Sequence, residues 1–112
     1  MTKPDKSKLY RIAFLNHGKV YELFCTGVNT SHLLGFVEVT GLEFEEKDSL
    51  VVDPTEEKMR DEFDDVEVLH LPMHSVMRVE QVRKKGKVVI RDRESGEKVM
   101  PFPNQPGNRS RQ

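Results

Sequence analysis

The residues best suited to chemistry in this chain are its four histidines and its single cysteine. His70 and His74 are four positions apart, the spacing that brings two metal ligands to one face of a helix. Pro72 lies between them and opposes a helix there, and neither paired cysteines nor a further ligand motif lie nearby. We therefore expect neither a metal site nor a cofactor, and we interpret both histidines as partly exposed residues at a corner of the chain.

Nucleophilic catalysis would require a hydroxyl or thiol group beside a base. Cys25 lies in the middle of a predicted strand, on its apolar face, where a small thiol usually serves as a core residue. Ser31 precedes His32 and Ser75 follows His74, but neighbouring side chains on a strand point to opposite faces. We therefore predict no catalytic residue, and we expect that the chain is not an enzyme.

Charge is distributed unevenly along the chain, although the formal net charge is only −1. Residues 1–11 have a local balance of +3, residues 43–68 of −9 and residues 78–112 of +6. The acidic segment has neither the spacing of paired catalytic carboxylates nor the alternating ligands and central glycine of a calcium loop. It is interpreted either as a solvated strand edge and helix face or as a surface that recognises a basic partner.

The basic stretch near the C-terminus is the strongest candidate for a contact surface. Residues 84–87 predict a tight turn, which would make residues 83–93 a basic β-hairpin. Period-two alternation would place positions 85, 87, 91 and 93 on one outer side, with Val88 and Ile90 facing inward. The predicted contact residues are Arg83, Lys84, Lys85, Lys87, Arg91 and Arg93.

Two functions of this basic stretch stay open. A basic β-ribbon can follow the phosphates of a nucleic acid. No aromatic residue is interleaved in the stretch, however, so it offers no platform for stacking bases. Lysines at the tip of a hairpin also protect an edge strand from unwanted pairing, which requires no ligand at all.

Alternating apolar residues predict several short strands. The first two, over 9–15 and 19–28, form a hairpin whose turn contains Asn16 and Gly18, residue types that tolerate left-handed backbone angles. Gly41 predicts a bulge or bend in the next extended segment. The remaining extended segments are predicted at 34–46, 50–52, 66–71, 76–82 and 88–90.

One short helix is predicted over residues 53–63. Asp53 has the type of an N-cap, Pro54 suits the first helical position, and Glu56 is placed for a capping box. Met59 and Phe63 are four positions apart and predict the buried stripe of this helix.

The count of strands favours a mostly β (α+β) fold. We expect either a small SH3-like or Sm-like barrel or a strongly bent antiparallel sheet, with the one helix near 53–63. Pro72, between two predicted strands, resembles the last corner of such barrels. Residues 1–8 are predicted to form a flexible basic arm, residues 9–100 a single domain and residues 101–112 a disordered tail.

Five segments carry a resemblance to a known family. They are Tyr10-Arg11-Ile12 through Phe14-Leu15-Asn16, Gly18-Lys19-Val20-Tyr21-Glu22-Leu23, Gly35-Phe36-Val37-Glu38-Val39, Val51-Val52-Asp53-Pro54-Thr55-Glu56-Glu57-Lys58 and Leu71-Pro72-Met73-His74-Ser75-Val76. Over roughly residues 9–91 the chain resembles a bacterial family known as domain-of-unknown-function family 1820. The resemblance implies a bacterial, cytoplasmic protein, and it transfers no catalytic or binding residue because the family has no assigned activity.

These observations predict a binding protein. No apolar run approaches the length of a membrane helix, and a lone cysteine suits a reducing cytoplasm. We expect a non-enzymatic cytoplasmic module, an adaptor or regulator that contacts another protein through the basic hairpin, the acidic segment or an exposed edge strand. The alternative is an Sm-like RNA-binding protein that uses the basic 83–93 hairpin. The sequence leaves the partner and the oligomeric state undetermined.

Overall fold

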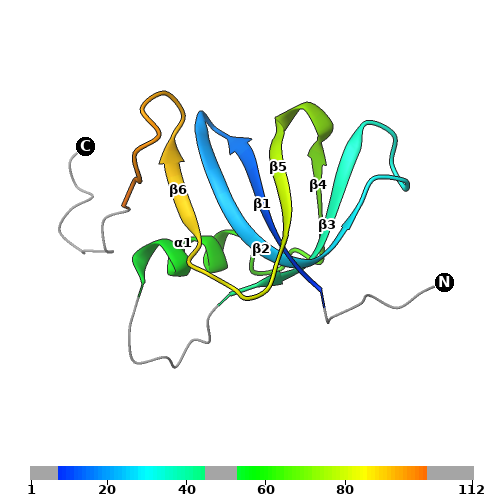
Figure 1. The fold of residues 1–112 in the computed structure, drawn as a ribbon, viewed down its shortest axis with the longest axis horizontal. Coiled ribbons are helices and arrows are strands. Elements are labelled where there is room, and N and C mark those ends of the chain that lie inside the picture. Colours follow the sequence, from blue (N-terminus) through cyan, green and yellow to red (C-terminus); the bar gives the residue numbers. More distant parts are fainter. Residues whose placement is uncertain (1–7, 45–52, 101–112) are drawn as a thin grey trace.

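The computed structural model describes residues 8–44 and 53–100, which form one antiparallel sheet with one α-helix (Figure 1). Neighbouring strands follow the order β4-β3-β2-β1-β5, and β6 pairs with β2. The elements are β1 Leu9–Asn16, β2 Lys19–Asn29, β3 Phe36–Glu43, α1 Pro54–Glu62, β4 Val68–Pro72, the 3-10 turn η1 Met73–Ser75, β5 Val76–Val82 and β6 Val89–Asp92. The prediction of a mostly β fold with one short helix is confirmed.

Some predicted elements lie outside the described residues. These are the strand over 50–52, the tail over 101–112 and all but the last residue of the arm over 1–8. In the parts of the chain that are described, no helix combines the length and the apolar character that crossing a bilayer requires.

The β1–β2 hairpin is the centre of the sheet. Asn16 pairs with Lys19, so the connection is the two-residue turn His17-Gly18, with φ angles of 54° and 78°. Two left-handed residues in succession match the twist of a hairpin. The predicted hairpin is therefore confirmed, but the left-handed partner of Gly18 is His17 and not Asn16.

Strand β2 has eleven residues and is long enough to pair with two different strands along the side away from β1. Residues 19–22 pair with β6 on the side away from β1, whereas residues 24–29 pair with β3. Opposite the middle of β2, Gly41 of β3 has a φ of 68°, and a Cβ there would collide with Oγ1 of Thr26. Since the pairing register is the same on both sides of Gly41, this position is a bend and not a bulge.

The corner predicted at Pro72 is present. Strand β4 ends at Pro72, η1 makes a single turn, and β5 begins at Val76 (Figure 1). However, β4 and β5 are the two ends of the strand order and do not pair with each other, so the sheet of the described residues is open. The small closed barrel is therefore not supported, and the alternative, a strongly bent sheet, describes the fold. Pro72 contributes to this result because proline has no N–H to donate to a closing ladder.

Helix α1 follows its predicted N-terminus closely. The Asp53 side chain accepts hydrogen bonds from the backbone N–H groups of Thr55 and Glu56, at 3.0 and 3.4 Å. Met59 is fully buried and Phe63 is buried against the same core, as the spacing predicted. The helix packs against β6 and so covers one end of the sheet.

The predicted basic hairpin over 83–93 is wrong. Strand β5 pairs with β1 and β6 pairs with β2, so the two strands lie on opposite sides of the central hairpin. The segment between them crosses over instead of turning back. The physical reason is burial, because Val88 and Ile90 are each 3% exposed and belong to the core, and Ile90 pairs with the buried Tyr21 of β2.

Candidate functional site

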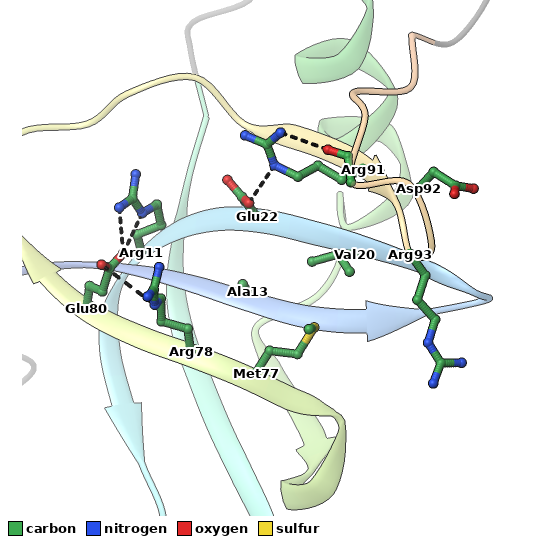
Figure 2. A pocket seen from close by; sticks show the side chains of 11 residues that line it. Arg11, Ala13, Val20, Glu22, Met77, Arg78, Glu80, Arg91, Asp92 and Arg93 are labelled. Carbon is green, nitrogen blue, oxygen red and sulfur yellow. Dashed lines mark hydrogen bonds and ion pairs between the residues drawn. The ribbon is translucent and has the colours of Figure 1, made fainter.

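The outer face of the sheet carries a groove of about 550 Å³ across β5, β1, β2 and β6 (Figure 2). Strand alternation explains which side chains line it. On β1, Ile12 faces the core, so Arg11 and Ala13 face outward. On β2, Val20 and Glu22 face outward for the same reason. We call this feature the arginine groove, and its lining residues are Arg11, Ala13, Val20, Glu22, Met77, Arg78, Glu80, Arg91, Asp92, Arg93 and Gly96.

Strand β5 supplies one wall of the groove. Its pairing with β1 shifts register between Ala13 and Phe14, where Met77 is the extra residue. This bulge brings both Met77 and Arg78 to the groove, whereas strict alternation would place one of them on the other face. The Met77 side chain joins Ala13 and Val20 in an apolar floor between the charged walls (Figure 2).

Two arginine–carboxylate pairs hold the walls. Glu80 lies directly opposite Arg11 in the ladder, and its Oε1 accepts from Arg11 Nε at 2.8 Å and lies 2.6 Å from Nη2. Across the groove, Glu22 Oε2 accepts from Arg91 Nε at 3.0 Å. Arg91 Nη1 also donates to the carbonyl oxygen of Gly96 at 3.2 Å. These contacts fix the direction of both guanidinium groups.

The other two arginines that line the groove are less constrained. Arg78 is 69% exposed in its side chain, and its Nε lies 3.9 Å from Glu80 Oε2, beyond hydrogen-bond distance. Arg93 is exposed and makes no ion pair within the described residues. In Figure 2, Arg78 and Arg93 lie on either side of the apolar floor.

A turn after β6 holds Arg93 in place. The Asp92 carboxylate accepts hydrogen bonds from the backbone N–H groups of Ser95 and Glu94, at 2.9 and 3.1 Å. The hydrogen bond from Ser95 is the main cause that lowers the pKa of Asp92. The carboxylate is thus engaged in forming the turn, and Arg93, the next residue, lines the edge of the groove.

The chemistry of the arginine groove is that of anion binding. Guanidinium groups bind carboxylates and phosphates through paired N–H donors. Among the described residues that line the groove, no side chain carries a thiol, hydroxyl or imidazole, and the carboxylates of Glu22 and Glu80 are engaged by arginines. The guanidinium groups of the arrangement suit holding an anionic group.

The structure divides the six predicted contact residues into three groups. Arg91 and Arg93 line the arginine groove. Lys85 instead contacts Glu56 in the first turn of α1, and Lys87 contacts the N-cap residue Asp53. Arg83 and Lys84 are exposed on the crossing segment, outside the groove. The prediction that positions 85, 87, 91 and 93 share one side is therefore wrong, whereas the inward direction of Val88 and Ile90 is confirmed.

Lys85 and Lys87 connect the crossing segment to the helix. Lys85 Nζ lies 3.3 Å from Glu56 Oε2, a carboxylate whose side chain is 2% exposed, and 5.6 Å from the centre of the Phe24 ring. Lys87 Nζ lies 3.5 Å from Oδ2 of the N-cap residue, Asp53. Part of the predicted contact surface thus holds the fold together.

Several groove residues were missed at the level of sequence. Arg11 and Glu80 are 69 positions apart, so only the β1–β5 register brings them together. The alternation around Ile12 predicts that Arg11 faces outward, and this pattern could have added Arg11 to the predicted contact residues. The bulge that adds Met77 had no visible signal.

The histidines and the cysteine lie away from the groove. Cys25 is fully buried, and burial is the main cause that raises the pKa of its thiol to about 11. His32 Nδ1 lies 2.7 Å and His70 Nε2 lies 4.0 Å from Oε1 of Glu38, a cluster not predicted from sequence. Over the described ranges, no group of histidine, cysteine and acidic residues has the geometry of a metal site.

Comparison with known proteins assigns the chain to a family. No curated protein and no solved structure matches the chain. A family model described as a domain of unknown function, DUF1820, matches residues 8–104, which include every element of the sheet. The chain therefore belongs to the DUF1820 family.

Proposed function

We propose that this chain is a non-enzymatic binding module, an adaptor or regulator of the bacterial cytoplasm, and that it contacts another protein through the arginine groove. The observation that supports this proposal is the convergence of Arg11, Arg78, Arg91 and Arg93 on one groove. Two of them are neutralised by Glu80 and Glu22, which leaves Arg78 and Arg93 to attract an anionic group.

The composition of the groove favours acidic side chains of a protein as the ligand. Its floor of Ala13, Val20 and Met77 suits the aliphatic parts of a peptide, while the arginines on both sides suit carboxylates. Glu22 and Glu80 neutralise two of the four arginines and Asp92 adds a third carboxylate, so the groove has little excess positive charge for the closely spaced phosphates of a nucleic acid. A partner with separated negative charges fits better than a continuous phosphate chain.

The cytoplasmic part of the proposal rests on the cysteine. Cys25 is the single cysteine of the sequence, is a free thiol and is fully buried, so the fold gains nothing from an oxidising compartment.

RNA binding is the second candidate, because Arg83 and Lys84 are exposed close to the end of β5. The tyrosines give it little support. Tyr21 is 5% exposed, and Tyr10 is partly buried against the core, so neither presents an open ring face for a base.

A matched pair of charge reversals tests the proposal. Arg93→Glu changes the groove, whereas Arg83→Glu makes the same change of charge outside it. Fluorescence anisotropy would measure the affinity of each variant for a synthetic peptide of alternating glutamate and valine, and for a mixed-sequence single-stranded RNA. We expect R93E to weaken peptide binding about tenfold and R83E to change it less than about twofold.

The RNA candidate predicts a different pattern. Both reversals would weaken RNA binding to a similar extent, and the affinity for RNA would fall steeply with added salt. Equal effects of R93E and R83E on the peptide would contradict a role for the groove.

A further inference from the structure

Strand β5 has an unpaired edge. Within the described residues it pairs with β1 on one side, and no strand lies on the other. Such an edge presents backbone N–H and C=O groups to any extended chain of suitable sequence. Strand β4, at the opposite end of the strand order, is shorter and ends in Pro72, a residue that discourages pairing. Strand β5 is seven residues long and contains neither proline nor lysine, so it is the less protected edge.

The sequence of β5 is complementary to itself. Arg78 and Glu80 are placed symmetrically about Val79 and share the outer face of the sheet. If two copies of β5 ran antiparallel with Val79 at the centre, Arg78 of each copy would lie directly opposite Glu80 of the other. Opposite charges in directly opposed positions stabilise a strand pair, and the two Val79 side chains would meet on the other face.

The side chains at this edge are available for such pairing. Arg78 is 69% exposed in its side chain and Val79 is 42% exposed, although Val79 is an apolar residue in the middle of a strand. Glu80 uses Oε1 for Arg11, while its Oε2 has only the 3.9 Å approach of Arg78 Nε in the same chain. One oxygen of Glu80 is therefore placed to accept from a second guanidinium group.

We propose that the protein forms a symmetric dimer in which the β5 strands of two copies pair antiparallel about Val79. The sheets of both copies then become one continuous sheet, and a two-fold axis perpendicular to it keeps both arginine grooves on the same face. The bulge at Met77 limits the regular ladder to the residues from Arg78 onward. Arg78 and Glu80 also line the arginine groove, so Arg93, which takes no part in the proposed strand pairing, is the residue that tests groove binding separately.

The proposed dimer also gives a role to the bulge at Met77 on the edge strand β5. A bulge ends regular pairing, so it prevents β5 from acting as a template along its whole length. The symmetric triplet Arg78-Val79-Glu80 is left as the segment that selects its own copy. A foreign strand without this charge pattern would place like charges or uncharged groups opposite Arg78 and Glu80.

Charge reversal followed by mixing tests the proposal. Analytical ultracentrifugation of the full chain, from about 10 µM to about 1 mM, would measure the dimer dissociation constant, a range suited to a small interface. R78E makes the edge doubly acidic and E80K makes it doubly basic. We expect each variant alone to dimerise at least about tenfold more weakly than the unmodified chain.

An equimolar mixture of R78E and E80K provides the decisive measurement. In a mixed dimer, each acidic position faces a basic one, so we expect the mixture to restore dimerisation. R83E is the matched control, because it reverses one charge just beyond the end of β5 and should leave the dissociation constant unchanged. Circular dichroism of each variant would check that E80K, which also removes the partner of Arg11, is still folded.

Three outcomes would overturn the proposal. They are a monomer at every concentration, an assembly larger than a dimer, or a dimer of the unmodified chain that R78E leaves intact. Failure of folded R78E and E80K to associate when mixed would also exclude this register. None of these results would affect peptide binding by the groove, which R93E tests separately.

Discussion

The two ends of the basic segment 83–93 have similar charges, but their side chains make different contacts. At the lysine end, Lys85 and Lys87 contact carboxylates at the N-terminus of α1, one of which is buried. At the arginine end, Arg91 is held by Glu22 in the wall of the groove and Arg93 is exposed. The difference shows that the burial of the neighbouring carboxylates decides the role of a basic side chain. Lys85 and Lys87, which we call the clamp, hold the crossing segment to α1, whereas an exposed arginine such as Arg93 is available for contact.

The clamp has a physical cause in the crossover of the chain. The segment from β5 to β6 must pass from one side of the central hairpin to the other, and few apolar residues are available to hold it. A lysine has a long aliphatic stem that lies along apolar surface while its ammonium group reaches a carboxylate. Lys85 does both, over the Phe24 ring and beside Glu56.

Removal of the clamp is expected to have the largest effect. Lys85→Ala takes away the ammonium group beside a carboxylate that is 2% exposed, and we expect the free energy of unfolding to fall by about 2 kcal/mol. Lys84→Ala, one position earlier and exposed, should change it by less than about 0.5 kcal/mol. Urea unfolding followed by circular dichroism measures both, and similar losses for the two variants would contradict the clamp.

At the other end of the segment, the effects of replacing Arg91 and Arg93 on the free energy of unfolding should differ by a smaller amount. Arg91→Ala removes the hydrogen bonds to Glu22 and to the Gly96 carbonyl, and we expect a loss of about 1 kcal/mol in the free energy of unfolding. Arg93→Ala should leave stability within about 0.5 kcal/mol. The same urea unfolding measurement compares them. If Arg93→Ala were the more destabilising of the two, Arg93 would have to be assigned a structural role.

Local signals in the sequence were sufficient for the elements and insufficient for their pairing. The hairpin, the capped helix and the proline corner each depend on residues within about ten positions, such as Asp53 with Pro54, and all three were predicted correctly. The partner of β6 was not, because an apolar strand after a glycine turn fits beside β5 or beside β2 equally well in sequence. Burial of Ile90 in the core decides between them, and that depends on the whole sheet.

The arginine groove illustrates the same limit. Arg91 and Arg93 were in the predicted contact set because they are close in sequence to other basic residues. Arg11 joins them only through β2, and Arg78 only through β1 and the bulge at Met77. A surface site assembled from four strands depends on the register in which the strands pair, and this register is difficult to predict from a single sequence.

The smallest predicted effect concerns the turn that carries Arg93. The pKa of Asp92 is lowered from its usual 3.8, chiefly by the hydrogen bond from Ser95 N–H, so the carboxylate form is favoured in the folded state. A lowered folded-state pKa gives stability that is present above about pH 3.8 and disappears as the pH falls through the folded-state value. Asp92→Asn should therefore be less stable than the unmodified chain at neutral pH, and the difference should shrink below that pH.

Parallel unfolding measurements at pH 7 and near pH 3 would check this expectation for Asp92. Glu94→Gln is the control, because it removes one charge from the same turn without removing the acceptor of the Ser95 and Glu94 N–H groups. A difference between D92N and the unmodified chain that stays constant with pH would mean that the ionised carboxylate does not hold the turn. The turn that carries Arg93 would then depend on its other hydrogen bonds, those from Gly96 N–H to the Asp92 carbonyl, from Asp92 N–H to the Glu97 carbonyl and from Glu97 N–H to Ser95 Oγ.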